Sequence, residues 1–249
     1  MQKKNKKNIL WKGTLNKFPI KNNNFFESNL WIEKLRKNKK LIEKNFIFYD
    51  YFIYPIILSE LKIKKKLEIL DFGGGLGELY IKLRRFTEKK FKFNLTVIEN
   101  KIICKLANNI YKHVNNVKYF ENLKYIKGKI FGIIHLGSSI QYVEMWEDLI
   151  KQICSYNPKY IIFSDTPLTK NKSFISNQII NKKNIVPYRF LNKNDLINCL
   201  KINNYELISM VPFKDPCHYS QKTLPMGNFK KENRIKNTSN LLFKKKSDI

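Results

Sequence analysis

The sequence predicts an α/β fold with a mostly parallel sheet. Short apolar segments of strand character alternate with segments of helical periodicity from about residue 67 to residue 212. Such alternation is typical of parallel sheets that carry helices on both faces. The last two predicted strands, 205–212 and 239–244, have no helical pattern between them, so we expect them to pair antiparallel. With 249 residues, 43% of them hydrophobic, the chain can bury one core of good size.

Seven strands and the helices between them follow from this pattern in chain order. Residues 1–62 form an N-terminal extension, partly helical and rich in aromatics, which could close over a substrate. Residues 63–249 form the main domain, in which Asn192 is a predicted N-cap with Asp195 in the first turn of its helix. Residues 168–191 and 214–238 are expected to be long connections. The predicted strands are 67–72, 91–98, 117–120, 129–136, 159–164, 205–212 and 239–244, and the predicted helices are 28–44, 46–61, one after Gly77, 101–114, 144–155 and 192–202.

The strongest motif is the glycine-rich turn that follows the first of these strands. Its pattern is Asp71-x-Gly73-Gly74-Gly75-x-Gly77. It lacks the Gly-Lys-Ser/Thr of a P-loop, and Glu78 stands where the dinucleotide fingerprint has its last glycine. Missing Cβ atoms let a ligand approach the backbone, and the flanking carboxylates suit a ligand with positive charge. The turn resembles the first motif of class I S-adenosylmethionine methyltransferases. The alternative is a tight strand–helix turn without a ligand.

Glu99 is the second candidate for cofactor binding. It ends the predicted strand 91–98 and lies 22 residues after Gly77. In nucleotide-binding folds, an acidic residue about 20 residues beyond the glycines holds the ribose hydroxyls. The alternative role is a helix-starting glutamate that is favoured by the helix dipole.

Three further blocks carry a resemblance to a known group of proteins. Residues 138–143, 158–168 and 186–190 follow the glycine motif in this order, and Trp11-Lys12-Gly13 precedes it. Together they resemble predicted bacterial methyltransferases that are associated with surface-polysaccharide biosynthesis loci. This resemblance implies the class I methyltransferase fold, S-adenosyl-L-methionine as cofactor, and a small acceptor such as a sugar or nucleotide-sugar. It supplies no catalytic residue.

The acceptor should approach from the carboxyl ends of the strands 129–136 and 159–164. Asp165 is the best candidate for a base toward a sugar hydroxyl, although an Asp-Thr-Pro turn could bind its own backbone instead. Tyr142 is the second catalytic candidate, and we expect His135 to be a core residue. The remaining polar candidates at these strand ends are Ser138, Ser139 and Thr166.

The charge of +28 leaves an RNA or DNA methyltransferase open as an alternative. Only five of the 48 basic residues are Arg, however, and the Asn/Asp-Pro-Pro-Tyr/Phe motif of amino-methylating enzymes is absent. Pro216-Cys217 lies too late in the chain for a cytosine-C5 nucleophile. A non-catalytic scaffold that retains the cofactor is the third alternative.

The remaining composition favours a cytoplasmic protein. The longest apolar runs are too short to span a membrane, which takes about 20 residues, and the N-terminus lacks the apolar segment of a signal peptide. The four cysteines form no C-x-x-C pair, and His218 has no further ligand nearby in the sequence. We therefore expect no metal site and no disulfide framework.

Overall fold

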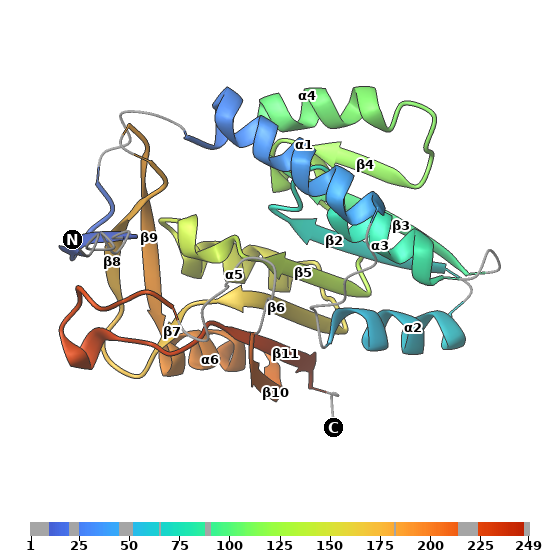
Figure 1. Ribbon diagram of the computed structural model, residues 1–249. Helices are drawn as coiled ribbons and strands as arrows, with labels where there is room; N and C mark the ends of the chain where they lie inside the picture. Colours follow the sequence, from blue (N-terminus) through green and yellow to red (C-terminus); the bar gives the residue numbers. More distant parts are fainter. Residues whose placement is uncertain are drawn as a thin grey trace.

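The computed structural model describes residues 10–19, 25–44, 52–64, 66–87, 91–181, 183–213 and 224–246. A seven-stranded sheet in the order β10-β11-β6-β5-β2-β3-β4 lies at its centre (Figure 1). The five strands from β6 to β4 pair in parallel, whereas β11 pairs antiparallel with both neighbours. The predicted fold class is therefore confirmed. The strands are β2 (Lys66–Phe72), β3 (Lys92–Ile98), β4 (Val117–Phe120), β5 (Ile133–Gly137), β6 (Tyr160–Thr166), β10 (Tyr205–Pro212) and β11 (Ser239–Lys245).

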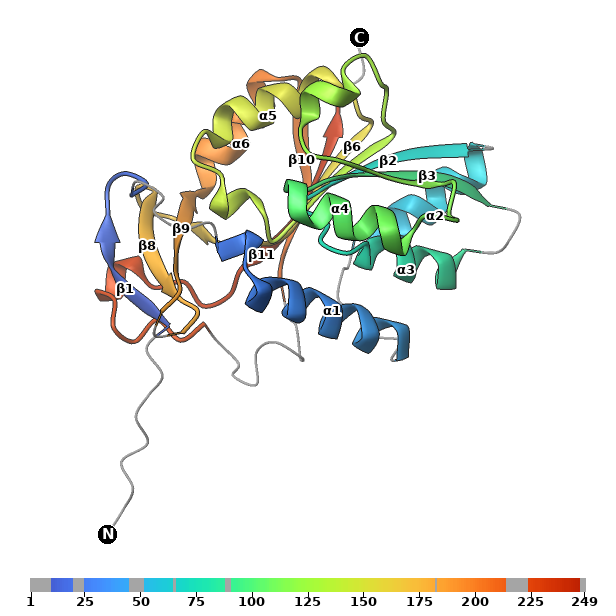
Figure 2. The same ribbon diagram turned by 90° about the horizontal axis from the view of Figure 1, so that it is seen from above.

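Helices cover both faces of this sheet, and each face has its own core (Figure 2). Successive strand residues point to opposite faces, so Ile69 packs into one core and Leu70 into the other. On the Ile69 side lie α1 (Asn29–Lys44), α2 (Ile53–Ile63), α3 (Glu78–Phe86) and α4 (Lys101–Ile110), and on the Leu70 side lie α5 (Trp146–Ser155) and α6 (Lys193–Ile202).

The predicted helix cap at Asn192 is present, because its side chain accepts a hydrogen bond from the backbone N–H of Asp195.

A second, four-stranded sheet lies beside the carboxyl ends of the central strands (Figure 1). Its order is β1-β8-β9-β7, and it corrects the expectation that residues 168–191 are a connection. Pro187 in the middle of this segment weakens the strand signal. Among the described strands, β8 alone pairs with β9 at that position. The strands are β1 (Trp11–Leu15), β7 (Leu168–Thr169), β8 (Phe174–Ile179) and β9 (Ile185–Asn192).

An aromatic core holds the second sheet together. Trp11 is 1% exposed and packs against Tyr188, Phe190 and Phe229, with ring centroids 4.8–6.3 Å apart. The N-terminal strand β1 therefore belongs to a sheet that residues 168–192 complete. The division of the chain at residue 62 stays a sequence-based proposal. The aromatic residues between 46 and 51 lie outside the described residues.

Two of the predicted boundaries differ from the observed ones by four residues. Helix α4 ends at Ile110 rather than at Val114, and β5 begins at Ile133 rather than at Lys129. In both cases the apolar pattern extends beyond the regular element. None of the described helices has the length and apolarity needed to cross a membrane.

Candidate functional site

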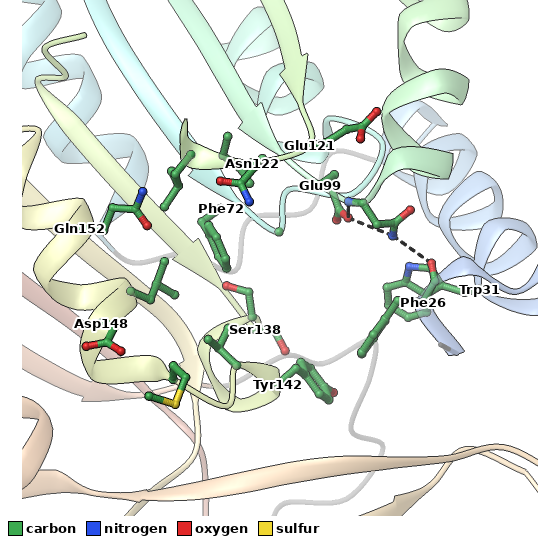
Figure 3. Close-up of a pocket in the computed structure, with 18 residues that line it drawn as sticks. Phe26, Trp31, Phe72, Glu99, Glu121, Asn122, Ser138, Tyr142, Asp148 and Gln152 are labelled. Atoms are coloured by element: carbon green, nitrogen blue, oxygen red, sulfur yellow. Dashed lines mark hydrogen bonds between the residues drawn. The ribbon is translucent and has the colours of Figure 1, made fainter. Parts of the chain in front are cut away.

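A cleft of about 530 Å³ opens where the carboxyl ends of β2, β3, β4 and β5 meet (Figure 3). Its volume lies within the range of small-molecule sites, about 300–1,000 Å³. Parallel strands bring their carboxyl ends to one edge, which is the usual ligand edge of such sheets. The cleft is lined by Phe26, Trp31, Phe72, Gly73, Ile98, Glu99, Asn100, Glu121, Asn122, Leu123, Ser138, Ser139, Tyr142, Val143, Met145, Asp148, Leu149 and Gln152.

The glycine turn forms one wall of the cleft. Gly73, Gly75 and Gly77 have φ of +73°, +56° and +79°, a region that side chains with a Cβ rarely adopt. A Cβ on Gly73 would lie 2.7 Å from the Cβ of Ser139, and one on Gly77 would lie 2.7 Å from the Tyr111 hydroxyl. Of the four motif glycines, Gly73 alone is a lining residue. The backbone conformation and the close packing of the turn therefore require most of these glycines, whether or not a ligand binds.

Asp71 lies beneath the turn rather than in the cleft. Its side chain is buried, with Oδ1 2.8 Å from Nδ1 of His135, and His135 Nε2 lies 3.1 Å from Ser164 Oγ. A Cβ on Gly74 would approach the Asp71 carboxylate to 2.3 Å. The carboxylate thus fills the space that Gly74 leaves open. His135 is buried, as the sequence predicts.

Glu99 connects the end of β3 to the glycine turn. Its carboxylate accepts hydrogen bonds from the backbone N–H groups of Gly75 and Asn100, both at 3.0 Å. Burial raises the pKa of Glu99, and these two hydrogen bonds partly oppose that rise. Asn100 caps α4, because its Oδ1 accepts from the N–H groups of Ile102 and Ile103. Glu99 is therefore not required to start the helix, and the ribose role stays a prediction.

The cleft lining includes further polar residues that were not candidates from the sequence, some beside Glu99 and others across the cleft from it. Glu121 and Asn122 follow β4, and Asp148 and Gln152 lie four residues apart on α5 (Figure 3). The rule that selected Glu99, an acid directly after a parallel strand, also applies to Glu121. Asp148 and Gln152 could have been found as polar residues on one face of the predicted helix 144–155.

An aromatic wall from three distant segments borders the cleft near Tyr142. The Tyr142 ring lies 4.9 Å from Phe26 and 5.3 Å from Tyr188, and its hydroxyl donates to Gln178 Oε1 at 3.0 Å. Phe26 is held near the end of β3 because its carbonyl accepts a hydrogen bond from the Asn100 side chain at 3.1 Å. The predicted candidate Tyr142 therefore lies at the cleft, at its junction with the second sheet.

Asp165, the predicted base, lies outside the residues that line the cleft. Its φ is +54°. Its Oδ1 accepts from the Thr238 hydroxyl at 2.5 Å, and its backbone N–H donates to Asn240 Oδ1 at 3.2 Å. A catalytic role for Asp165 stays a prediction. Thr166 is buried, and its hydroxyl has no hydrogen-bond partner among the described residues.

The electrostatic character of the cleft contrasts with the composition of the chain. Glu99, Glu121 and Asp148 contribute three carboxylates, and none of the 18 residues that the structure places along its walls is Lys, Arg or His. Such a lining suits a neutral or cationic ligand better than a phosphate. Pro216, Cys217 and His218 lie outside the described residues.

Comparisons with solved structures find the same fold in methyltransferases. An S-adenosylmethionine-dependent methyltransferase from Clostridium acetobutylicum is 14% identical, with 88% of this chain and 100% of that chain covered and a TM-score of 0.55. The 1,6-didemethyltoxoflavin-N1-methyltransferase from Burkholderia thailandensis, solved with S-adenosylhomocysteine, is 10% identical, with 87% and 86% covered and a TM-score of 0.52. The magnesium protoporphyrin IX methyltransferase from Synechocystis, solved with S-adenosylmethionine, is 11% identical, with 92% and 87% covered and a TM-score of 0.50.

These likenesses cover most of the chain and show that it has the fold of class I S-adenosylmethionine-dependent methyltransferases. At this level of identity they show the fold alone. No family model matches the sequence, and the search of curated proteins finds no related sequence.

Proposed function

We propose that this protein is an S-adenosylmethionine-dependent methyltransferase. The observation that carries the proposal is the pairing of Glu99 with the glycine turn at the carboxyl edge of the sheet. The Glu99 carboxylate lies at the cleft and is aligned by the N–H groups of Gly75 and Asn100. A lining with three carboxylates and no described cation fits a cofactor that carries a sulfonium and an ammonium group.

The residues present give each part of such a cofactor a partner. Glu99 would hold the ribose hydroxyls, as in other nucleotide-binding sheets. Gly73 offers bare backbone to the amino-acid portion, and the polar pair Glu121 and Asn122 would face the base from the end of β4. Asp71 acts indirectly, because it supports the turn from below through Gly74.

Bound S-adenosylmethionine would supply an already activated methyl group, so the protein has to orient the acceptor and take up its proton. Phe26, Trp31 and Tyr142 form the wall that would position an acceptor and exclude water. Asp165 is our candidate for the base that takes this proton. Its carboxylate would have to give up the hydrogen bond from Thr238 and accept one from the hydroxyl group of the methyl acceptor instead. The net result is an O-methyl product, S-adenosylhomocysteine and one proton.

We further propose that the acceptor is a small hydroxylated molecule, such as a sugar or the sugar part of a nucleotide-sugar, methylated in the cytoplasm for surface-polysaccharide biosynthesis. The support is the motif resemblance of residues 138–143, 158–168 and 186–190. The lack of a described cation in the cleft lining speaks against a nucleic-acid backbone there. The Tyr142 hydroxyl, bonded to Gln178, would help to bind the sugar.

The test combines cofactor binding with methyl transfer. Calorimetry should show one S-adenosylmethionine per chain. Radiolabelled methyl transfer to sugars and nucleotide-sugars, compared with tRNA and DNA at two ionic strengths, identifies the acceptor class. Transfer to RNA that persists at high salt, without transfer to sugars, would overturn the acceptor proposal. Cofactor binding without transfer to any substrate would favour the scaffold alternative.

A further inference from the structure

A second cleft lies at the other end of the central strands, where β5 and β6 begin and β11 ends. We call this end the amino edge of the sheet, because the parallel strands begin there, and the opposite end the carboxyl edge. Its volume is about 320 Å³. Because a seven-residue strand is about 20 Å long, this cleft is roughly that far from the glycine turn. It is lined by Lys64, Ile130, Phe131, Gly132, Asn157, Lys159, Lys244, Lys245 and Lys246. We call it the lysine cleft.

The lysine cleft gathers more positive charge than its surroundings neutralise. Five of its nine lining residues are lysines. The buried carboxylate of Glu60 lies 2.6 Å from Lys159 Nζ and 3.9 Å from Lys64 Nζ. Lys244, Lys245 and Lys246 have no ion pair with any residue that the structure describes. Among the described residues, Glu60 therefore pairs with two of the five lysines, and Lys244, Lys245 and Lys246 have no carboxylate partner.

Lysine-rich composition alone does not account for this gathering. About one residue in six of the chain is lysine, so random sampling would place one or two lysines in a lining of nine. The cleft beside the glycine turn has no lysine among its 18 lining residues, although the same lysine-rich chain forms it. Lysine is thus enriched at one edge and excluded from the other.

The backbone around the lysine cleft is held by hydrogen bonds between distant segments. The Lys245 N–H donates to the Lys159 carbonyl, and the Lys246 N–H donates to the Asn204 carbonyl, both at 3.0 Å. Phe131, 1% exposed, closes the floor. The backbone that carries the three consecutive lysines is therefore fixed, so it loses little entropy when a ligand binds.

We propose that the lysine cleft binds a small soluble ligand through a phosphate-bearing group with at least two negative charges. Lysine ammonium groups are compact donors that bind phosphate as point charges. The concave shape and the volume favour a diphosphate-sized group over the backbone of a long polymer. The site is separate from methyl transfer, so it stands whether or not the proposed function is correct.

The experiment is a calorimetric titration of the full chain with inorganic pyrophosphate at physiological salt, with sulfate as a weaker competitor. We expect saturable binding of one pyrophosphate per chain. The double variant Lys244→Ser/Lys246→Ser should weaken it at least tenfold. The matched control Lys105→Ser/Lys118→Ser removes the same charge from exposed positions on α4 and β4 and should change affinity less than twofold. If the double variant does not fold, Lys64→Ser at the exposed end of α2 replaces it, with an expected loss of about threefold.

Several outcomes would overturn the proposal. Equal weakening in the cleft variant and the control would show that pyrophosphate binds only through net charge. Binding to RNA or to phosphatidylglycerol vesicles, without saturable binding of pyrophosphate, would assign the lysines to a polymer or membrane surface instead. S-adenosylmethionine affinity, measured in parallel, should be the same in all variants, so failure here is distinguishable from failure of the proposed function.

Discussion

The two clefts lie at opposite ends of the strands of the central sheet, and they differ in charge. At the carboxyl edge, Glu99 and Glu121 follow β3 and β4 and line a cleft without a described cation. At the amino edge, Lys159 precedes β6, Lys244 and Lys245 end the antiparallel β11, and Lys246 follows it. Five lysines in all line the other cleft. In a parallel sheet the residues before and after each strand collect at separate edges. A net charge of +28 therefore describes neither site, and each edge has to be considered by itself.

The largest expected effect concerns the support beneath the carboxyl edge. His135→Leu leaves the buried Asp71 carboxylate without the ring nitrogen 2.8 Å away. Removing one partner of a buried pair costs about 3–5 kcal/mol, and we expect that loss in the free energy of unfolding, measured with urea. The control His113→Leu, at an exposed position after α4, should cost less than about 0.5 kcal/mol. Similar losses in both variants would show that the Asp71–His135 pair does not support the turn.

A second substitution should abolish ligand binding at this edge by distorting the glycine turn, with some loss of stability. Gly75→Asp puts a side chain at φ +56°, with its Cβ 3.1 Å from Leu35, beside the carboxylate of Glu99. We expect S-adenosylmethionine affinity to fall more than about 100-fold, or roughly 3 kcal/mol. Gly128→Asp is the matched control, since Gly128 has φ +83° and open space around it. Calorimetry that finds equal affinity in the two variants would contradict the assignment of this turn.

The charge of Glu99 should make ligand binding at the carboxyl edge depend on pH. Glu99→Gln should weaken cofactor binding by about 1.5–3 kcal/mol, the scale of a hydrogen bond to a charged group. Because burial raises the pKa of Glu99, the carboxylate takes up its proton at a higher pH than an ordinary glutamate. Wild-type affinity should therefore fall as pH decreases through this raised pKa. Affinity measured between pH 4 and 8 should show that fall, and Glu99→Gln should lack it. A parallel fall in both proteins would assign the pH dependence to another group.

The smallest effect is expected at the amino edge, in the absence of ligand. Lys244→Ser/Lys246→Ser relieves repulsion among neighbouring ammonium groups and should stabilise the fold by about 0.5 kcal/mol at low ionic strength. The gain should shrink in 1 M salt, where the Debye length is about 3 Å. Thermal unfolding of this variant and of the Lys105/Lys118 control at both salt concentrations measures it. A gain that is independent of salt would not be electrostatic.

Much of this molecule could be predicted because strand ends obey a simple geometric rule. Glu99 follows an apolar strand at a fixed distance from the glycines, and its neighbour Gly75 is its hydrogen-bond donor. Glu121 obeys the same rule after the correctly predicted strand Val117–Phe120, but no glycine motif at a known spacing singled it out. The local sequence was sufficient to predict a site residue wherever a single strand and the loop after it place that residue at the cleft.

Features that depend on distant segments could not be read in this way. Asp165 turns toward Thr238 because β11 returns antiparallel beside β6, and no local pattern encodes that contact. Phe26 lies at the cleft because its carbonyl accepts a hydrogen bond from the side chain of Asn100, which is 74 residues away in the sequence. The strand β9 escaped prediction because Pro187 interrupts its pattern, and β8 because its partner β1 lies near the beginning of the chain.

The pairing of β1 with β8 also has a consequence for synthesis on the ribosome. Trp11 lies opposite Gln178, and the carbonyl of Gly13 accepts from the Ser176 hydroxyl at 2.7 Å. At about 5–20 residues per second, the partner strand emerges roughly 10–30 seconds after β1. Throughout that interval Trp11 has no aromatic core to enter, since Tyr188, Phe190 and Phe229 have not yet been made. The second sheet can therefore form only late in translation, after the glycine turn and its neighbouring strands have left the ribosome.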